Sequence, residues 1–173
     1  VAGERLDPPT YYWLEQHLQV PIIDHWWQTE TGWSICANLA GIELLPSRAG
    51  ACGVPAPGWD LRVLDESGQE VAAGEEGAIV VKAPLPPSAF ATVWRDHERF
   101  QQSYWSQFPG FYLTGDGGYQ DADGYVYVMG RTDDVINVAG HRLSTGRIEE
   151  VVAEHSAVAE CAVVGIHDAE KGQ

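Results

Sequence analysis

The first hydrophobic pattern along the chain has the period of a helix. Asp7 precedes two prolines, and Asp is a good N-cap while proline suits the first turn. Tyr11, Leu14 and Leu18 then fall on one helical face. The pattern therefore predicts an amphipathic helix that begins directly after Asp7.

A second helical pattern lies near the other end of the chain. Ser144 or Thr145 can cap a helix there, and apolar positions recur behind the cap at i, i+3, i+4 and i+7. These positions are Ile148, Val151, Val152 and His155. Because His155 falls on the apolar stripe, it is most simply interpreted as a packed residue at the helix end. A third helix, rich in aromatic and charged residues, is expected near residues 94–105.

Short extended segments separate these helices. Residues 20–23 form a continuous apolar run of the kind found in buried parallel strands. Residues 135–138, followed by a turn at Ala139 and Gly140, predict a small hairpin. Further strands are expected over residues 59–64, 77–82, 125–129 and 161–165. The predicted fold class is therefore mixed α/β, with antiparallel β-rich parts.

The composition and the net charge of the chain limit the kinds of molecule that it can bind. The 173 residues are 45% hydrophobic, which is enough for a packed core, and 25 Asp and Glu stand against 10 Lys and Arg, for a formal net charge of −15. This charge repels phosphate backbones and anionic lipid headgroups, so binding to a nucleic acid polymer or to a membrane surface is disfavoured. An anionic ligand would need a few well-placed arginines, backbone N–H groups or a metal ion.

The sequence indicates neither a membrane-spanning nor a secreted protein. It has no run of 18 apolar residues, and its first residues lack the basic start and apolar stretch of a signal peptide. Cys36, Cys52 and Cys161 are odd in number and widely spaced, which fits buried thiols in a reducing compartment. Because the chain does not start with Met and stops just after a strand-like run, we expect it to be an internal segment of a longer protein.

Three polar stretches carry candidate chemistry. The first, Asp-His-Trp-Trp-Gln-Thr-Glu-Thr-Gly over residues 24–32, follows the predicted strand at 20–23, and ligands in open α/β sheets bind at the C-terminal ends of strands. Thr29 and Glu30 could hold a phosphate and a Mg²⁺ ion, which prefers oxygen ligands. A tryptophan-rich corner of the core with an exposed polar loop would explain the same residues.

The second stretch is Tyr-Leu-Thr-Gly-Asp over residues 112–116. Asp116, presented by a glycine turn, can accept two hydrogen bonds from a ribose diol, although a solvated turn residue is the alternative. The nearby Asp-Ala-Asp-Gly over residues 121–124 lacks the bidentate glutamate of an EF-hand and is interpreted as a turn.

The third stretch covers residues 130–142 and contains Arg131 and Arg142. Arginine suits bidentate contacts to phosphate or ribose oxygens, whereas each arginine alone could be a surface ion-pair partner. Motifs of other enzyme classes are absent, since the sequence has no GxSxG, HExxH, GxxxxGK[ST] or GxGxxG. Its six histidines are scattered, which argues against a zinc cluster.

In this order the three stretches resemble the core motifs of adenylate-forming enzymes, specifically the short-chain acyl-CoA synthetases. They resemble, in turn, the adenine and Mg²⁺ loop, the ribose motif, and the hinge with the start of the small C-terminal domain. Val-Lys-Ala-Pro-Leu-Pro-Pro over residues 81–87 is similar to the propionate branch. The resemblance implies the C-terminal part of a large AMP-binding domain, a sheet plus a β-rich subdomain, over residues 1–132. It implies the start of a small α+β domain over residues 133–173.

The resemblance also implies ligand contacts. One group would surround the adenine and the α-phosphate of ATP: Gly3, Glu4, Arg5, Asp24, His25, Trp26, Gln28 and Thr29. A second group would bind the ribose, the phosphates and the pantetheine of CoA: Asp116 and Arg131, then Arg142, then Ala139 and Gly140. The catalytic residues would be Thr29, Glu30 and Arg142, with Glu30 holding Mg²⁺, and Asp133 would be the hinge.

The implied reaction joins a carboxylate to CoA. The carboxylate attacks the α-phosphate of ATP to give an acyl-adenylate and pyrophosphate, and the CoA thiol then displaces AMP, so positioning and charge neutralisation dominate. Trp27 would floor a short acyl pocket, and Ala2 stands where acetate-preferring relatives carry a larger valine. One methylene is worth about 1–3 kcal/mol of discrimination, so a preference for propionate over acetate is expected. The implied location is the bacterial cytoplasm or the mitochondrial matrix.

The sequence also departs from this family. It lacks both the phosphate-cradling loop with its lysine and the catalytic lysine of the small domain, so this chain alone is expected to have no ligase activity. Arg5 stands where many relatives have proline, and Arg147 replaces a frequent acidic residue. The alternative function is a non-catalytic nucleotide- or partner-binding domain built from the same fold elements. Seven tryptophans could suggest a carbohydrate platform, but most fall in or beside predicted elements, which favours core packing.

Overall fold

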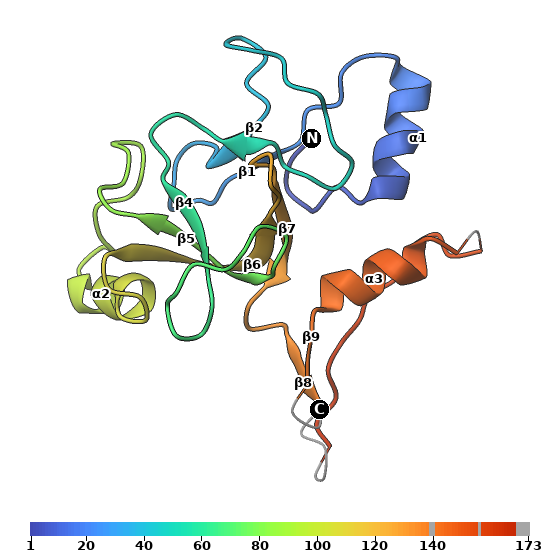
Figure 1. Ribbon diagram of the computed structural model, residues 1–173. Coiled ribbons are helices and arrows are strands. Elements are labelled where there is room, and N and C mark those ends of the chain that lie inside the picture. Colours follow the sequence, from blue (N-terminus) through green and yellow to red (C-terminus); the bar gives the residue numbers. More distant parts are fainter. Residues whose placement is uncertain (139–140, 156, 169–173) are drawn as a thin grey trace.

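A four-stranded antiparallel sheet forms the centre of the computed structural model, which describes residues 1–138, 141–155 and 157–168 (Figure 1). Its strands lie in the order β4 (Leu61–Leu64), β5 (Gly77–Lys82), β6 (Phe111–Gln120) and β7 (Val126–Arg131). Side chains of β6 alternate between buried and half-buried, and Ile79, Val80 and Val81 of β5 are completely buried. The sheet is therefore covered on both faces along β5, as its unbroken apolar run requires.

A small three-stranded antiparallel sheet lies beside the central one. It consists of β1 (His25–Trp26), β2 (Cys36–Ala37) and β3 (Val54–Pro55). Cys36 shares one hydrophobic core with Val81 and Tyr112 of the central sheet. This shared core fixes the polar loop that follows β1 against the middle of β6. Cys36, Cys52 and Cys161 are free thiols.

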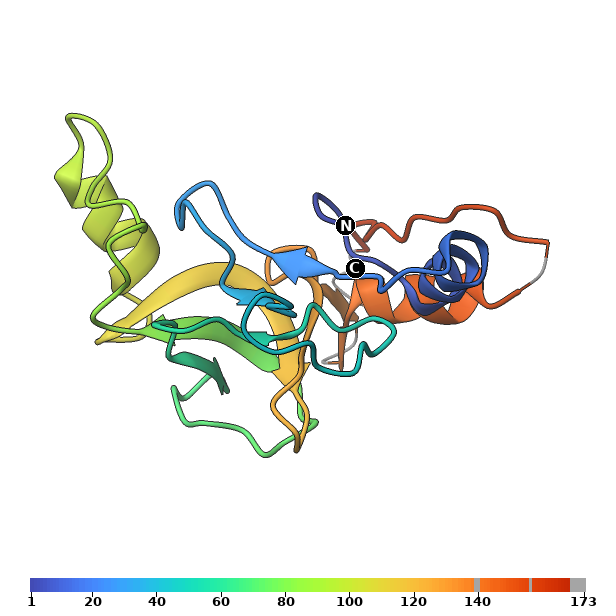
Figure 2. The same cartoon turned by 90° about the horizontal axis from the view of Figure 1, so that it is seen from above.

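Two of the predicted helices are present, and the cap expected at Asp7 is confirmed. Helix α1 (Pro8–Leu18) begins after Asp7, whose Oδ1 accepts the N–H of Thr10 at 2.9 Å. Helix α2 (His97–Trp105) is capped by Asp96 and packs on β6 through Tyr104 and Trp105, whose rings contact Tyr112. Figure 2 shows α2 and α1 at opposite ends of the molecule, with the central sheet between them.

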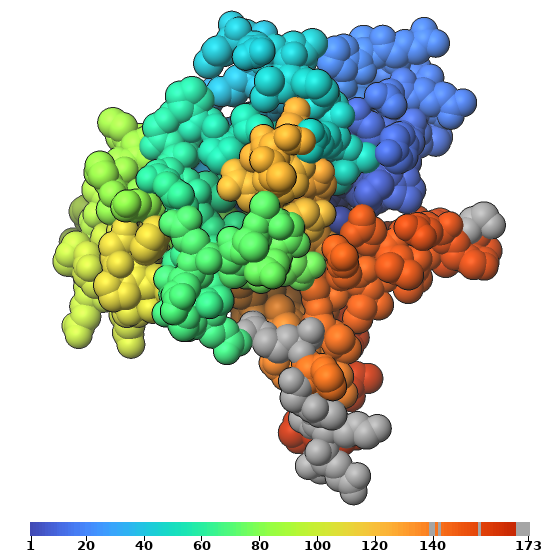
Figure 3. Space-filling model, in the orientation of Figure 1, coloured from blue at the N-terminus to red at the C-terminus, as the bar shows by residue number. Residues whose placement is uncertain are grey.

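The predicted hairpin and the helix after it are also present. Strands β8 (Ile136–Val138) and β9 (His141–Leu143) pair antiparallel, and α3 (Thr145–Ala153) follows with Ser144 as its N-cap. The turn predicted at residues 139–140 lies outside the described residues. In Figure 3 the hairpin and α3 project from the body formed by the rest of the chain.

Two predicted strands are wrong. Residues 20–23 form no strand in the described structure, since Pro21 has no N–H to donate and Val20 is 56% exposed. The segment 161–165 is not a strand either. A side chain takes the place of a neighbouring strand there, because the N–H of Val163 donates to Oε1 of Glu149 at 2.8 Å.

Three finer predictions also need correction. His155 is not packed at a helix end, because α3 stops at Ala153 and the His155 ring is exposed, with Nδ1 accepting the N–H of Ala157. Asp116 is presented by the interior of β6 rather than by a turn. The tryptophans are less buried than expected. Trp59 is in the core, but four of them are at least 48% exposed: Trp13, Trp27, Trp33 and Trp94.

Candidate functional site

A cleft of about 960 Å³ brings the three polar stretches together. The N-terminal segment and the loop around β1 form one side, and β6 and β7 contribute Asp116 and residues 128–131. The hinge region, the start of α3 and residues 163–165 form the remaining wall. A cleft between two structural units is a common place for a ligand to bind.

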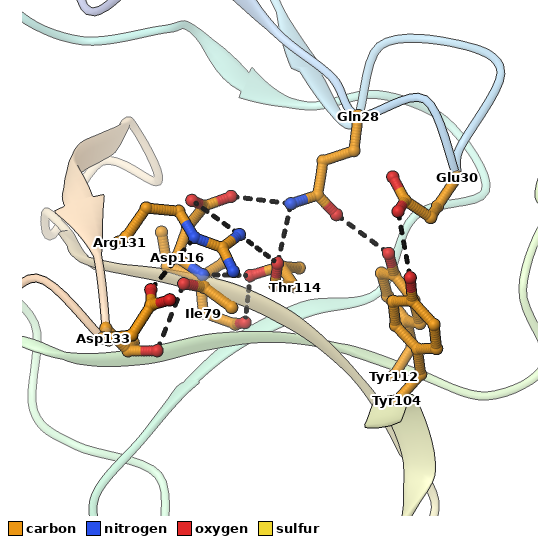
Figure 4. A network of polar contacts seen from close by, with 11 residues as sticks. Gln28, Glu30, Ile79, Tyr104, Tyr112, Thr114, Asp116, Arg131 and Asp133 are labelled. Atoms are coloured by element: carbon orange, nitrogen blue, oxygen red, sulfur yellow. Dashed lines mark hydrogen bonds and ion pairs between the residues drawn. The ribbon is translucent and has the colours of Figure 1, made fainter. Parts of the chain in front are cut away.

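Asp116 lies at the centre of the polar contacts in this cleft (Figure 4). It is only 8% exposed, and its Oδ2 accepts the side-chain N–H of Gln28 at 2.7 Å. Its other oxygen, Oδ1, lies 3.6 Å from Nη1 of Arg131. Burial raises the pKa of the Asp116 carboxyl, while Arg131 and hydrogen bonds from Gln28 and Trp26 act against that rise. The carboxylate thus keeps acceptor capacity for a diol.

Arg131 is held in place by β6. It is the cross-strand partner of Asp116, and its Nη1 donates to the carbonyl of Thr114 at 3.2 Å. The guanidinium lies against Gly115, where φ is +76° and a Cβ would come within 2.5 Å of Nη2. Glycine is therefore favoured at this position by its positive φ, and any larger residue would also displace the guanidinium of Arg131.

Gln28 connects the loop after β1 to the sheet. Its Nε2 donates to Asp116 and to the carbonyl of Thr114, both at 2.7 Å, and its Oε1 accepts the hydroxyl of Tyr112 at 2.9 Å. The loop itself is fixed by Thr31, which is completely buried and whose hydroxyl accepts the N–H of Gln28 at 3.0 Å. The amide side chain of Gln28 is therefore oriented before any ligand arrives.

Glu30 lies beside this network but does not line the cleft. Its Oε1 accepts the hydroxyl of Tyr104 at 3.0 Å, and the Tyr104 ring stacks on Tyr112 with centroids 5.6 Å apart. Burial, and then Glu30 itself, raise the pKa of the Tyr104 phenol, so it stays protonated and donates. Within the described residues no three His, Cys, Asp or Glu side chains form a metal cluster. One positioned carboxylate does fit Mg²⁺, which often binds through one or two carboxylates plus substrate phosphates.

Asp24 and His25 line the cleft from the β1 side. Burial raises the pKa of Asp24 to about 6, although its Oδ1 accepts the N–H of His25 at 2.9 Å. Burial lowers the pKa of the His25 ring. Both groups therefore favour their neutral forms more than they would in water.

Most of the predicted ligand residues meet in this one cleft. Those that line it are Gly3, Glu4, Arg5, Asp24, His25, Trp26, Trp27, Gln28, Thr29, Asp116, Arg131 and Asp133. Ala2 and Glu30 do not line it, and Ala139, Gly140 and the side chain of Arg142 lie outside the described structure. Arg5 and Arg131 are the basic residues among the described lining positions, and no lysine is among them.

Residues without a predicted role complete the site. Tyr104, Tyr112 and Thr31 carry the hydrogen bonds that orient Glu30 and Gln28. Tyr112 belongs to the motif Tyr-Leu-Thr-Gly-Asp, and its place in that motif could have indicated a role in the site. Tyr104 had no comparable signal, because its partner Glu30 is 74 residues away in the sequence.

Comparisons with known proteins agree with the resemblance found in the sequence. Residues 1–91 match the family described as AMP-binding enzyme, and residues 147–173 match the AMP-binding enzyme C-terminal domain. Propionate--CoA ligase from Escherichia coli is 51% identical over 175 residues, covering 100% of this chain and 28% of the relative. A mouse protein, acyl-CoA synthetase short-chain family member 3, mitochondrial, is 51% identical over 176 residues, covering 99% of this chain and 25% of the relative. The chain thus spans about a quarter of the length of these relatives.

Solved structures share the fold. An ATP-bound RpMatB-BxBclM chimera superposes with a TM-score of 0.84 at 30% identity, covering 98% of this chain and 32% of that one. The anthranilate CoA ligase AuaEII, in complex with anthranoyl-AMP, gives a TM-score of 0.78 at 32% identity, covering 94% of this chain and 30% of that one. These matches confirm the mixed α/β fold and the resemblance to short-chain acyl-CoA synthetases. The chain belongs to the AMP-binding enzyme family.

Proposed function

We propose that this chain forms the nucleotide-binding part of an ATP-dependent short-chain carboxylate–CoA ligase. The observation that carries the proposal is Asp116, a buried carboxylate held between Gln28 and Arg131 in a cleft of about 960 Å³. A carboxylate fixed in this way matches two vicinal hydroxyls, as acidic residues do at other ribose sites. Relatives named as a propionate--CoA ligase and an acyl-CoA synthetase support the reaction class.

Different groups of cleft residues contact different parts of the nucleotide. Asp116 and Arg131 bind the ribose, and the Gly3–Glu4–Arg5 segment with residues 24–29 encloses the adenine and the α-phosphate. Residues 1–132 act as the end of the large domain, and residues 133–173, hinged at Asp133, as the start of the small one. In that small domain Arg142 contacts the phosphates, while Ala139 and Gly140 lie along the pantetheine of CoA.

The reaction needs positioning more than covalent help from the protein. An oxygen of the substrate carboxylate forms a bond to the α-phosphorus of ATP, the bond to pyrophosphate breaks, and the CoA sulfur later displaces AMP from the acyl carbon. Glu30 would hold Mg²⁺, which when bound would supply positive charge to the phosphates. Donors fixed in a protein cleft stabilise such charge better than water does, because they need not reorganise during the reaction. Trp27 and Ala2 form the limits of the acyl pocket, and the small side chain of Ala2 favours propionate over acetate.

The partners are small molecules: a short-chain carboxylate, ATP and CoA. The net charge of −15 leaves a nucleic acid polymer or an anionic membrane surface as poor partners. No helix in the described part of the chain is long and apolar enough to cross a membrane. The proposed location is the bacterial cytoplasm or the mitochondrial matrix, and a mitochondrial relative is consistent with the latter.

Exchange of radioactive pyrophosphate into ATP tests the adenylation step in the whole protein. We expect exchange that depends on propionate and falls sharply in Asp116→Asn. Asp60→Asn is the matched control, because Asp60 pairs with Arg62 and is not among the cleft residues. AMP binding without any acid-dependent exchange would instead support a non-catalytic nucleotide-binding domain.

A further inference from the structure

One wall of the cleft is docked onto the sheet through close backbone packing. Thr145, Gly146 and Glu149 of α3 line the cleft. Gly146 lies so close to the carbonyl oxygen of Met129 on β7 that a Cβ at this position would overlap it. The first turn of α3 therefore sits directly on the sheet edge that also carries Arg131. This contact sets the distance between α3 and β7, but it involves no charged side chain and no side-chain hydrogen bond.

Arg5 supplies the polar contact between the opposite wall and α3. Its Nη2 donates to Oε2 of Glu150 at 3.0 Å, and its Nη1 donates to the carbonyl of Gly146 at 3.4 Å. The side chains of Arg5 and Glu150 are 21% and 25% exposed, so solvent screens this pair less than an open surface pair. Arg5 lines the cleft, whereas Glu150 does not.

A second, more exposed ion pair joins the same helix to the residue that precedes β5. Nη1 of Arg147 lies 3.6 Å from Oε1 of Glu76, with side chains 60% and 40% exposed. All four charged residues influence the phenol of Tyr119, whose pKa is raised first by burial, lowered by Arg147 and Arg5, and raised by Glu150 and Glu76. Both pairs therefore act electrostatically on the Tyr119 phenol. Of these pairs, only the one made by Arg5 involves a cleft residue.

We propose that Arg5 is a positioning residue that couples the nucleotide side of the cleft to α3 through Glu150. Its position next to Gly3 and Glu4 means that a ligand ordering this segment also orders the guanidinium that holds α3. Reciprocity then requires that docking of α3 strengthens ligand binding by the same factor. The identity of the ligand as a nucleotide rests on the proposed function, but the contact between Arg5 and α3 does not.

Hydrogen–deuterium exchange of the nucleotide-free whole protein tests the contact. We expect Arg5→Gln and Glu150→Gln to speed exchange in residues 145–153 about three- to tenfold, as expected for a partly buried ion pair. The double variant Arg5→Glu with Glu150→Arg should restore most of the protection. Arg62→Gln is the matched control, since Arg62 pairs with Asp60 and Glu70 and is not a cleft residue.

The exchange rates distinguish a lost contact with α3 from a damaged fold. If both single variants match Arg62→Gln in α3, the proposal is overturned. If Arg5→Gln also loses protection in β5 and β6, it has damaged the fold, and Glu150→Gln on the helix surface then decides the question alone.

AMP titration by calorimetry tests the coupling. We expect Glu150→Gln to weaken AMP binding about two- to fivefold, although Glu150 is not a cleft residue. Unchanged AMP affinity together with a loosened α3 would overturn the coupling. If the unmodified protein does not bind AMP, the proposed function fails, while the exchange data still decide whether Arg5 holds α3.

Discussion

Asp116 and Arg131 face each other across β6 and β7, and Nη1 of Arg131 lies 3.6 Å from Oδ1 of Asp116. The pair is asymmetric, because the Asp116 side chain is 12% exposed and the Arg131 side chain 51% exposed. The carboxylate is therefore buried by the fold, while the guanidinium reaches outward toward the cleft and Asp133. A buried acceptor beside a reachable cation suits a ligand that offers hydroxyls and a negative charge.

Gly115→Ala should disturb this pair through space as well as through the backbone. The substitution places a methyl group at φ +76° and displaces the guanidinium of Arg131 from the carbonyl of Thr114. We expect a loss of about 2–3 kcal/mol in unfolding free energy, of which about 1–2 kcal/mol comes from the backbone and about 1 kcal/mol from the lost hydrogen bond. Gly74→Ala is the control, since Gly74 has φ +86° but nothing within 4 Å of its Cβ position, and should lose about 1–2 kcal/mol. Denaturant unfolding measures both. Equal losses in the two variants would show that Arg131 does not press on Gly115.

Asp24→Asn should stabilise the protein at neutral pH. Burial raises the pKa of Asp24 to about 6 from 3.8, so the folded state binds the proton more tightly than the unfolded state. Because Asp24 is only partly buried and solvent screens its charge, the charged form costs about 1–2 kcal/mol above pH 6, and this cost disappears as the pH falls from 6 toward 4. Unfolding free energies at pH 7.5 and pH 4.5 should show a gain for the variant only at the higher pH. A gain of equal size at both values would contradict the assignment.

Ala2→Val should shift acid preference toward acetate. The added methyl groups would take space from the acyl group, and the kcat/KM ratio of propionate to acetate should fall about fivefold or more. Competition between the two acids in the whole protein measures this ratio. Ala2 is exposed and does not line the cleft in this chain, so an unchanged ratio would remove Ala2 from the acyl pocket.

This chain alone should form no acyl-adenylate. Among the described residues that line the cleft, Arg5 and Arg131 are basic and none is a lysine, which leaves little positive charge for the β- and γ-phosphates of ATP. Incubation with ATP and propionate, followed by chromatography for propionyl-AMP, measures the product. Accumulation of propionyl-AMP would show that these residues suffice.

Capping residues in the sequence correctly predicted where helices begin, because these helix ends are stabilised by neighbouring residues. Asp7 and Ser144 cap their helices as predicted, because an N-cap acts on N–H groups two or three residues away. The run at 20–23 misled because strand formation needs a partner, and its pattern says nothing about where that partner is. In the same way, Gly115 predicted a turn, but it lies within β6, where it has a positive φ and the guanidinium of Arg131 packs against it.

The sequence predicted only those residues of the candidate site that belong to its motifs. Asp116, Gln28 and Arg131 were predicted as ligand residues, and the structure places them within one hydrogen-bonded network. The supports of that network come from distant parts of the chain, as in the contact of Tyr104 with Glu30. No hydrophobic period links residues so far apart, and they meet because α2 and the loop after β1 both pack on β6.

AMP titration of the whole protein with Asp116→Asn tests the central claim most directly. Removing the charge that would accept two ribose hydrogen bonds should weaken AMP binding about 10- to 100-fold, with Asp60→Asn unchanged. Thermal unfolding of the variant should stay within about 1 kcal/mol of the parent, since the asparagine oxygen can still accept from Gln28. The predicted result is lost affinity in an intact fold. Full AMP affinity in a folded Asp116→Asn variant would contradict a nucleotide site built around this carboxylate.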